Sequence, residues 1–323
     1  MRTALRSLAL CAAMALALPA AAREFRSADV HPADYPTVLA VKFIGEQLAA
    51  QTDGRLGVKV YPNGALGTER DTIEQLKIGG LDMMRINVAP LNNVVAETIV
   101  PALPFLFRSE DHMHAVLDGP IGEQILAAME AQGLIGLAFY DSGARSLYAA
   151  EKPVKNLADV AGMKIRVQQS DLFVAMVEAL GANPTPMPYG EVYTALKTGI
   201  VDAAENNFPS YESSRHFEAA KYYTMTEHSM APEVLVFSKV VWDTLTPEDQ
   251  ALIRKTAKES VPYMRKLWDE REAKSRATVE AGGAEIIALE DRQAWVDAMQ
   301  PVYAKFASTP ELQALVGQVQ ATK

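Results

Sequence analysis

Two arginines stand within or just beyond predicted strands, where a positive charge can bind an anion. Arg166 lies inside the apolar segment 163–167, and Arg145 follows the apolar segment 134–140 by a few residues. A buried guanidinium is costly without an anion, and its planar fork matches a carboxylate with two hydrogen bonds. For Arg166 the residues leave two interpretations equally open. One is an internal ion pair with one of the 40 acidic residues, and the other is a ligand carboxylate.

Catalytic chemistry finds little support in the sequence. There is no Gly-x-Ser-x-Gly elbow, no Walker loop and no dinucleotide fingerprint. His112 and His114 come closest to a metal pair, but residues two apart on a helix point to different faces. Ser142 has no histidine near it in the sequence to activate it. We therefore expect neither a metal nor a cofactor and no enzyme. An exported enzyme and an interaction protein without a small ligand remain as alternatives.

The composition excludes further classes of protein. The 323 residues are 49% hydrophobic and 22% charged, which is typical of a globular chain with one large or two medium domains. The net charge of −9 argues against binding to nucleic acid or to an anionic membrane surface. The single cysteine excludes an intramolecular disulfide.

Residues 1–22 have the features of a secretory signal peptide. Two arginines precede the apolar stretch Leu8–Leu18, and the small residues Ala20–Ala22 suit cleavage before Arg23. The apolar stretch is too short for a membrane span, and the bulky residue before Cys11 disfavours lipid attachment. We expect a periplasmic protein with a cleaved signal peptide and no direct membrane anchor.

Strand-like and helix-like segments alternate along the rest of the chain. Strands are predicted at 25–30, 56–61, 82–87, 134–140, 163–167, 201–205, 233–238 and 284–289. Helices are predicted at 36–51, 68–78, 116–129, 173–180 and 189–198, followed by a long helix from Thr246 that Pro262 should kink. This alternation favours α/β layers with parallel sheets, in which ligands bind beyond the carboxyl ends of the strands.

Several ordered motifs carry a resemblance to a known family. They are Tyr61–Arg70, Gln75-Leu76, Gly79–Met83, Leu103–Phe107, Gly162–Val167 and Tyr193–Asn206. Together they resemble the periplasmic solute-binding proteins of TRAP transporters (DctP type), over about residues 23–310. Their number and order make the resemblance specific, whereas none of them is specific alone.

The resemblance implies a fold and a role. The fold is the α/β two-lobe periplasmic binding protein fold, with a long helix spanning both lobes. Residues 23–145 would form mainly lobe 1, residues 146–240 mainly lobe 2, and the helical region 241–323 would complete both. Such a protein is a monomer that closes on an organic acid and delivers it to the TRAP transporter membrane subunits.

The resemblance also implies site residues. Arg166 occupies the position of the family's carboxylate-clamping arginine, Arg145 that of a second arginine, and Asn206 that of an asparagine bracing the clamp. The further candidates are Tyr189, Gln169, Asn87, Glu69 and His31, together with Asn207 and Tyr211, for which a hinge or helix-cap role is an equal alternative.

The candidate residues favour a ligand with one carboxylate and several hydroxyl groups. Besides the arginines they are hydrogen-bonding groups, and Glu69 accepts from hydroxyls while repelling a second carboxylate. The segment Ala204–Tyr211 also resembles the hexuronate-binding subgroup. We therefore expect glucuronate or galacturonate, with another sugar acid or a C4-dicarboxylate as the alternative.

Overall fold

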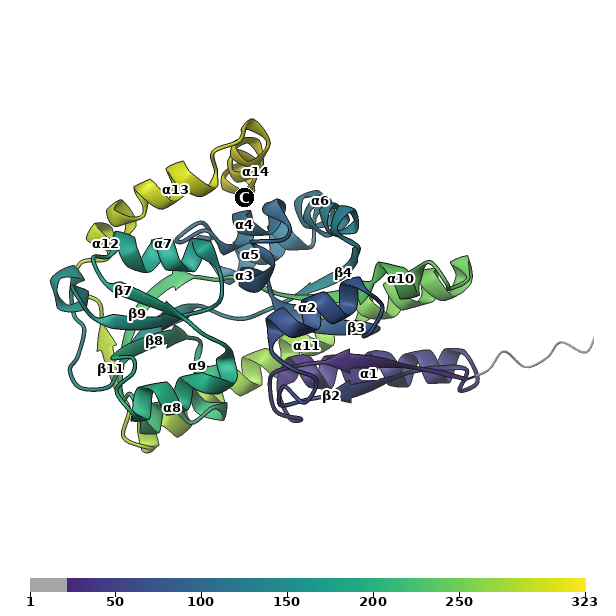
Figure 1. Ribbon diagram of the computed structural model, residues 1–323, viewed down its shortest axis with the longest axis horizontal. Helices are drawn as coiled ribbons and strands as arrows, with labels where there is room; N and C mark the ends of the chain where they lie inside the picture. Colours follow the sequence, from purple (N-terminus) through teal and green to yellow (C-terminus); the bar gives the residue numbers. More distant parts are fainter. Residues whose placement is uncertain (1–21) are drawn as a thin grey trace, which may run out of the picture.

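The computed structural model describes residues 22–323 and contains two β-sheets flanked by helices (Figure 1). The predicted signal peptide, except for its last residue, and Cys11 lie outside the described residues. Within 22–323, no helix combines the length and the hydrophobicity that a membrane span requires.

The first sheet has five strands and forms the centre of one lobe. In spatial order they are β2 (Leu56–Tyr61), β1 (Arg23–Ala28), β3 (Met83–Asn87), β10 (Glu233–Ser238) and β4 (Leu134–Tyr140). The strands β1, β2 and β3 are parallel, whereas β10 runs antiparallel to both of its neighbours. In this register Glu233 lies opposite Asn87 on one side and Tyr140 on the other, so three strand ends meet at one edge.

The second sheet has six strands and forms the centre of the other lobe. Their order is β11 (Glu285–Ala288), β9 (Tyr222–Ser229), β5 (Arg145–Ala149), β8 (Ala203–Asn206), β6 (Lys164–Val167) and β7 (Asn183–Pro186). The strand β5 is antiparallel to β8 and β9, while β6 is parallel to β7 and β8. Arg145, Arg166 and Asn206 therefore lie on neighbouring strands of one sheet.

Helices cover both sheets, and one of them joins the lobes. The shorter helices are α1 (Pro36–Gln51), α2 (Glu69–Lys77), α3 (Val88–Leu91), α4 (Ile99–Ala102), α5 (Glu110–Leu117), α6 (Pro120–Ala128), α7 (Asp171–Ala179), α8 (Val192–Lys197), α9 (Phe208–Ser213), α10 (Lys239–Trp242), α12 (Arg292–Ala298), α13 (Gln300–Phe306) and α14 (Pro310–Ala321). Short 3-10 helices lie at Ala96–Thr98, Met129–Gln132, Leu157–Val160, Tyr189–Glu191 and His216–Glu218. The 35-residue helix α11 (Pro247–Ala281) packs on α1 and β4 of the first lobe and on α9 of the second (Figure 1).

The helix α1 shows how apolar spacing positions a loop of the site. Val41, Ile44 and Leu48 are buried, as their spacing predicts. A Cβ atom on Gly45 would lie 3.0 Å from the backbone nitrogen and oxygen of Val58, so glycine lets the helix approach β2 closely. The loop between β1 and α1, which carries His31, is thereby held at the carboxyl edge of the first sheet.

The predicted elements agree with the structure in many places and differ in others. The helix 36–51 and the strands 56–61, 134–140 and 233–238 are confirmed at their predicted bounds. The expectation of parallel sheets is wrong in part, because β10 and β5 run antiparallel to their neighbours. The strand β10 returns from the second lobe and joins the first sheet, although it lies within residues 146–240. The strands β5 and β9 were not predicted.

Candidate ligand-binding site

A cavity lies between the two lobes, at the carboxyl ends of β3 and β8. Together with adjoining space that is open to solvent, it contains about 300 Å³ free of protein atoms. Three arginines line it, one from the first lobe and two from the second. Which of them is already paired with a protein carboxylate decides what the cavity can bind. The lining residues are Val30, His31, Glu69, Arg85, Asn87 and Glu233 from the first lobe, and Arg145, Arg166, Gln168, Tyr189, Asn206 and Ser210 from the second.

Arg166 is buried without a counterion. Only 2% of the residue is exposed, and its Nε and Nη2 donate to the carbonyl oxygen of Met187 at 3.1 and 2.8 Å. No carboxylate within residues 22–323 lies within 4.0 Å of its guanidinium, and Nη1 makes no hydrogen bond there. Burial lowers the pKa of Arg166, which reflects the poor solvation of its charge. The guanidinium is therefore ready for an anion.

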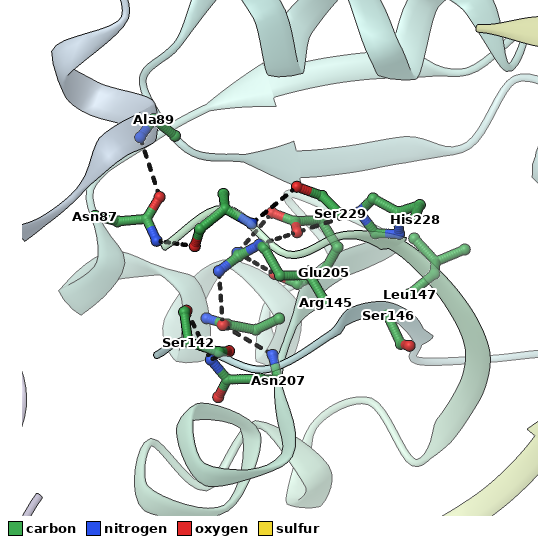
Figure 2. A network of polar contacts seen from close by, with 12 residues as sticks. Asn87, Ala89, Ser142, Arg145, Ser146, Leu147, Glu205, Asn207, His228 and Ser229 are labelled. Atoms are coloured by element: carbon green, nitrogen blue, oxygen red, sulfur yellow. Dashed lines mark hydrogen bonds and ion pairs between the residues drawn. The ribbon is translucent and has the colours of Figure 1, made fainter. Parts of the chain in front are cut away.

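Arg145, by contrast, is neutralised by a carboxylate of the same lobe. Its Nε and Nη2 donate to the two carboxylate oxygens of Glu205 at 2.6 and 2.9 Å (Figure 2). Its Nη1 donates to Oδ1 of Asn206 at 2.9 Å. Burial opposes ionisation of Glu205, but Arg145 and His228 lower the pKa of its carboxyl group to about 2. Arg145 is thus one half of a buried ion pair that holds Asn206 in place.

Arg85 is surrounded by carboxylates. Its Nε donates to Asp29 at 2.9 Å, its Nη2 contacts the other oxygen of Asp29, and its Nη1 donates to Glu233 at 2.6 Å. Glu69 lies 3.8 Å from the same Nη1. Burial would lower the pKa of Arg85, but the carboxylates of Asp29 and Glu233 raise it. The first-lobe side of the cavity therefore carries a surplus of acidic groups.

Glu69 has unused hydrogen-bonding capacity. It begins α2 directly after the N-cap Thr68, and its Oε1 lies 3.5 Å from the backbone nitrogen of Asn87. Burial raises the pKa of Glu69 to about 7, and Arg85 only partly opposes this effect. A carboxylate accepts about four hydrogen bonds, so most of this capacity is open to a ligand.

Aromatic residues close one side of the cavity and join the lobes. His31 stacks on Tyr35 at 3.8 Å between ring centroids and meets Tyr189 edge-on at 5.2 Å. Burial and the nearby Arg85 lower the pKa of His31, which is therefore neutral. The hydroxyl of Tyr35 bonds that of Ser210 at 2.9 Å across the cleft. Buried Nδ1 of His31 has no partner among residues 22–323.

The structure brings together most of the residues that the sequence singled out. Seven of the ten candidates line the cavity: Arg166, Arg145, Asn206, Glu69, Asn87, Tyr189 and His31. Gln169 does not line it, whereas its neighbour Gln168 does. In the orientation that satisfies both ends of its amide, Gln168 donates to Asn87 and accepts from Arg145, at 3.0 Å each.

Asn207 and Tyr211 lie outside the cavity and have structural partners. Asn207 caps α9 by accepting from the backbone nitrogen of Ser210 at 2.8 Å, and its Nδ2 donates to the carbonyl oxygen of Ser142 at 2.7 Å (Figure 2). Tyr211 is fully buried, and its hydroxyl donates to the carbonyl oxygen of Ala220 at 2.6 Å. Their place in the structure favours the cap and core roles.

Several lining residues escaped the sequence analysis. Arg85 shows the same pattern as Arg166, an arginine inside an apolar strand. That pattern would have been sufficient to identify it as a candidate. Glu233, Ser210 and Val30 carry no signal of their own, because only the meeting of the two lobes places them at the cavity.

Residues 27–309 match the family of bacterial extracellular solute-binding proteins, family 7 (DctP). The chain belongs to this family. The resemblance that the motifs indicated is thus confirmed, and the family is one of transport proteins rather than enzymes.

Solved structures of TRAP periplasmic solute-binding proteins share the fold. One from Bradyrhizobium sp. BTAi1, in complex with α/β-D-galacturonate, is 71% identical with a TM-score of 0.92, covering 93% of this chain and 100% of that one. One from Xanthobacter autotrophicus Py2, with bound β-D-galacturonate, is 55% identical with a TM-score of 0.91 and the same coverage. One from Chromohalobacter salexigens, with bound D-glucuronate, is 42% identical with a TM-score of 0.90, again with that coverage. The two-lobe fold is confirmed.

Proposed function

We propose that this protein captures a hexuronate, galacturonate or glucuronate, in the periplasm and delivers it to the membrane subunits of a TRAP transporter. The observation that carries the proposal is the buried guanidinium of Arg166, which has no carboxylate partner within residues 22–323. A ligand carboxylate supplies the missing negative charge and finds Nη1 unoccupied. We further propose that the protein acts as a monomer, after cleavage of its signal peptide, without a cofactor.

The ligand's hydroxyl groups find partners on both lobes. Oδ1 of Asn206 is already engaged by Arg145 and by the backbone nitrogen of Asn207, so its Nδ2 is left as a donor. Glu69 offers acceptor oxygens from the opposite lobe, and the neutral His31 offers one donor and one acceptor nitrogen. Such a mixture of donors and acceptors suits the hydroxyls of a sugar, which both donate and accept.

Charge compensation favours one ligand carboxylate over two. Of the three arginines, Arg85 and Arg145 are already paired with protein carboxylates, whereas Arg166 has no carboxylate partner within residues 22–323. A C4-dicarboxylate would place its second charge without a cation to receive it. The bound galacturonate and glucuronate in the similar proteins give independent support for a hexuronate.

A calorimetric panel tests the proposal. The mature protein is titrated with galacturonate, glucuronate, gluconate, succinate and malate, and we expect binding of one or both hexuronates with weaker or no binding of the dicarboxylates. The neutral hexose galactose is the matched control, because it keeps most of the hydroxyls and lacks the carboxylate. Tight binding of succinate or malate without a hexuronate response would refute the proposal.

A further inference from the structure

The surroundings of Arg85 differ from those of the other two arginines in the cavity. Its side chain is 1% exposed and meets carboxylates from three separate elements of the first lobe. Asp29 follows β1, Glu69 begins α2 and Glu233 begins β10. One guanidinium thus faces three acidic side chains, so this end of the cavity is an unfavourable place for another anion.

The three carboxylates hold Arg85 in different ways. Asp29 takes the edge formed by Nε and Nη2, and it is anchored in its own loop by the backbone nitrogen of His31 at 2.8 Å and the hydroxyl of Thr37 at 3.2 Å. Asp29 is not among the residues that line the cavity. The remaining nitrogen, Nη1, is the part of Arg85 left for a group inside the cavity.

Glu233 occupies that remaining nitrogen. Its Oε2 accepts from Nη1 of Arg85 at 2.6 Å, and its Oε1 accepts from Nδ2 of Asn87 at 3.1 Å and from the hydroxyl of Ser142 at 3.3 Å. The residue is 5% exposed and lines the cavity. Its position is defined on both sides by the register of β10 with β3 and β4. The side chain is therefore held in the place that a second ligand carboxylate needs.

We propose that Glu233 is a specificity-determining residue, which masks Arg85 and so restricts the site to acids with a single carboxylate. The inference rests on the proposed function. A ligand with a second carboxylate has to displace Glu233 from Arg85 or lie beside the acidic side chains of Glu233 and Glu69, and both cost binding free energy. A hexuronate instead brings hydroxyl groups, for which Oε2 of Glu233 and both oxygens of Glu69 have lone pairs available.

The test compares galacturonate with galactarate, a six-carbon sugar acid that carries a carboxylate at each end. Calorimetry on the unaltered protein should show at least about hundredfold weaker binding of galactarate, because like charges repel strongly in a partly buried site. In Glu233→Gln the amide keeps the shape and loses the charge, so it holds Nη1 of Arg85 more weakly and no longer repels a second carboxylate. We expect the ratio of galactarate to galacturonate affinity to rise at least about tenfold.

Control variants separate the change in affinity ratio from a general loss of stability or folding. Asp249→Asn removes a carboxylate that pairs with Arg55 through two hydrogen bonds and lies outside the cavity lining, so the affinity ratio should not change. Glu69→Gln should raise the ratio less than Glu233→Gln, because Glu69 lies 3.8 Å from Arg85. Circular dichroism and thermal unfolding establish that each variant is folded.

The outcomes distinguish the two proposals. Absence of hexuronate binding to the unaltered protein overturns the proposed function. Hexuronate binding with an unchanged affinity ratio in folded Glu233→Gln overturns the role of Glu233 alone. Equal affinity of the unaltered protein for galactarate and galacturonate also overturns that role, whether or not the variants fold.

Discussion

The lack of a carboxylate partner for Arg166 within residues 22–323 leads to a prediction that separates ligand affinity from the stability of the empty protein. In Arg166→Ala the ligand carboxylate loses its partner in a closed, buried site. Removal of one partner of a buried ion pair costs about 3–5 kcal/mol, which corresponds to a loss of affinity of about 150-fold to about 4,000-fold. Arg166→Lys keeps the charge but loses the fork and the two bonds to Met187, so it too should bind poorly.

The stability of the empty protein should depend on Arg166 much less than the affinity for the ligand does. Arg166 has no counterion among residues 22–323, so its removal relieves a poorly solvated charge and strands no carboxylate. Arg145→Ala is the matched control, because it leaves the buried Glu205 without its guanidinium partner, although His228 remains at 3.4 Å, and it should lower the free energy of unfolding by about 3–5 kcal/mol. Arg166→Ala should lower it by distinctly less than Arg145→Ala.

The assay combines hexuronate titration by calorimetry with urea unfolding of the empty proteins. Near-native affinity in Arg166→Ala would show that Arg166 does not bind the ligand carboxylate. Equal destabilisation of the empty protein by Arg166→Ala and Arg145→Ala would show that Arg166 has a structural anion, which contradicts its role as the arginine left for the ligand.

Three other features give shorter predictions. Burial raises the pKa of Glu69 to about 7, so the contribution of Glu69 to the stability of the empty protein should be lost as pH rises from about 4.5 to about 7. Glu69→Gln should therefore reduce the dependence of the free energy of unfolding on pH, as measured by urea unfolding. An unchanged pH dependence contradicts the raised pKa of Glu69. Ligand hydroxyls bind the ionised form, so hexuronate affinity should rise over the same range and binding should release a proton, which calorimetry in buffers of different ionisation enthalpy detects. Asn207→Ala should lower the free energy of unfolding by about 1–2 kcal/mol through loss of the α9 cap, with a smaller effect on affinity; the reverse order would indicate ligand contact. Tyr35→Phe removes the hydrogen bond to Ser210 across the cleft, which is worth about 1 kcal/mol. The rate of ligand release, measured by stopped-flow fluorescence, should therefore rise about fivefold. An unchanged rate shows that this bond does not hold the lobes together.

Local patterns account for the elements that the sequence predicted well. The helix α1 has a continuous apolar face and a proline in its first turn, and its predicted bounds are those observed. Thr68 caps α2 and forms a capping box with Asp71, a signal confined to four residues. The strand β9 was missed because buried polar residues such as Thr224, Thr226 and His228 interrupt its apolar pattern, and partners elsewhere in the fold satisfy them.

The composition of the site was easier to predict than its charge balance. The pattern around Arg166 pointed to an anion, but the partners of the other arginines are remote in the sequence. Glu205 is 60 residues from Arg145, and Glu233 is 148 residues from Arg85. Only the fold shows which of these arginines is still free, and that distinction underlies the choice between one and two ligand carboxylates.

The path of the chain between the lobes also has a consequence for how the protein unfolds. Neither sheet is made from one continuous stretch of the chain. In the sequence, β10 of the first sheet follows most strands of the second sheet, and β11 of the second sheet follows the long helix α11. Melting either lobe therefore withdraws strands or helix contacts from the other. We expect a single cooperative transition in calorimetric scans, and we expect that neither lobe can be produced as an independent fragment by cutting the chain once.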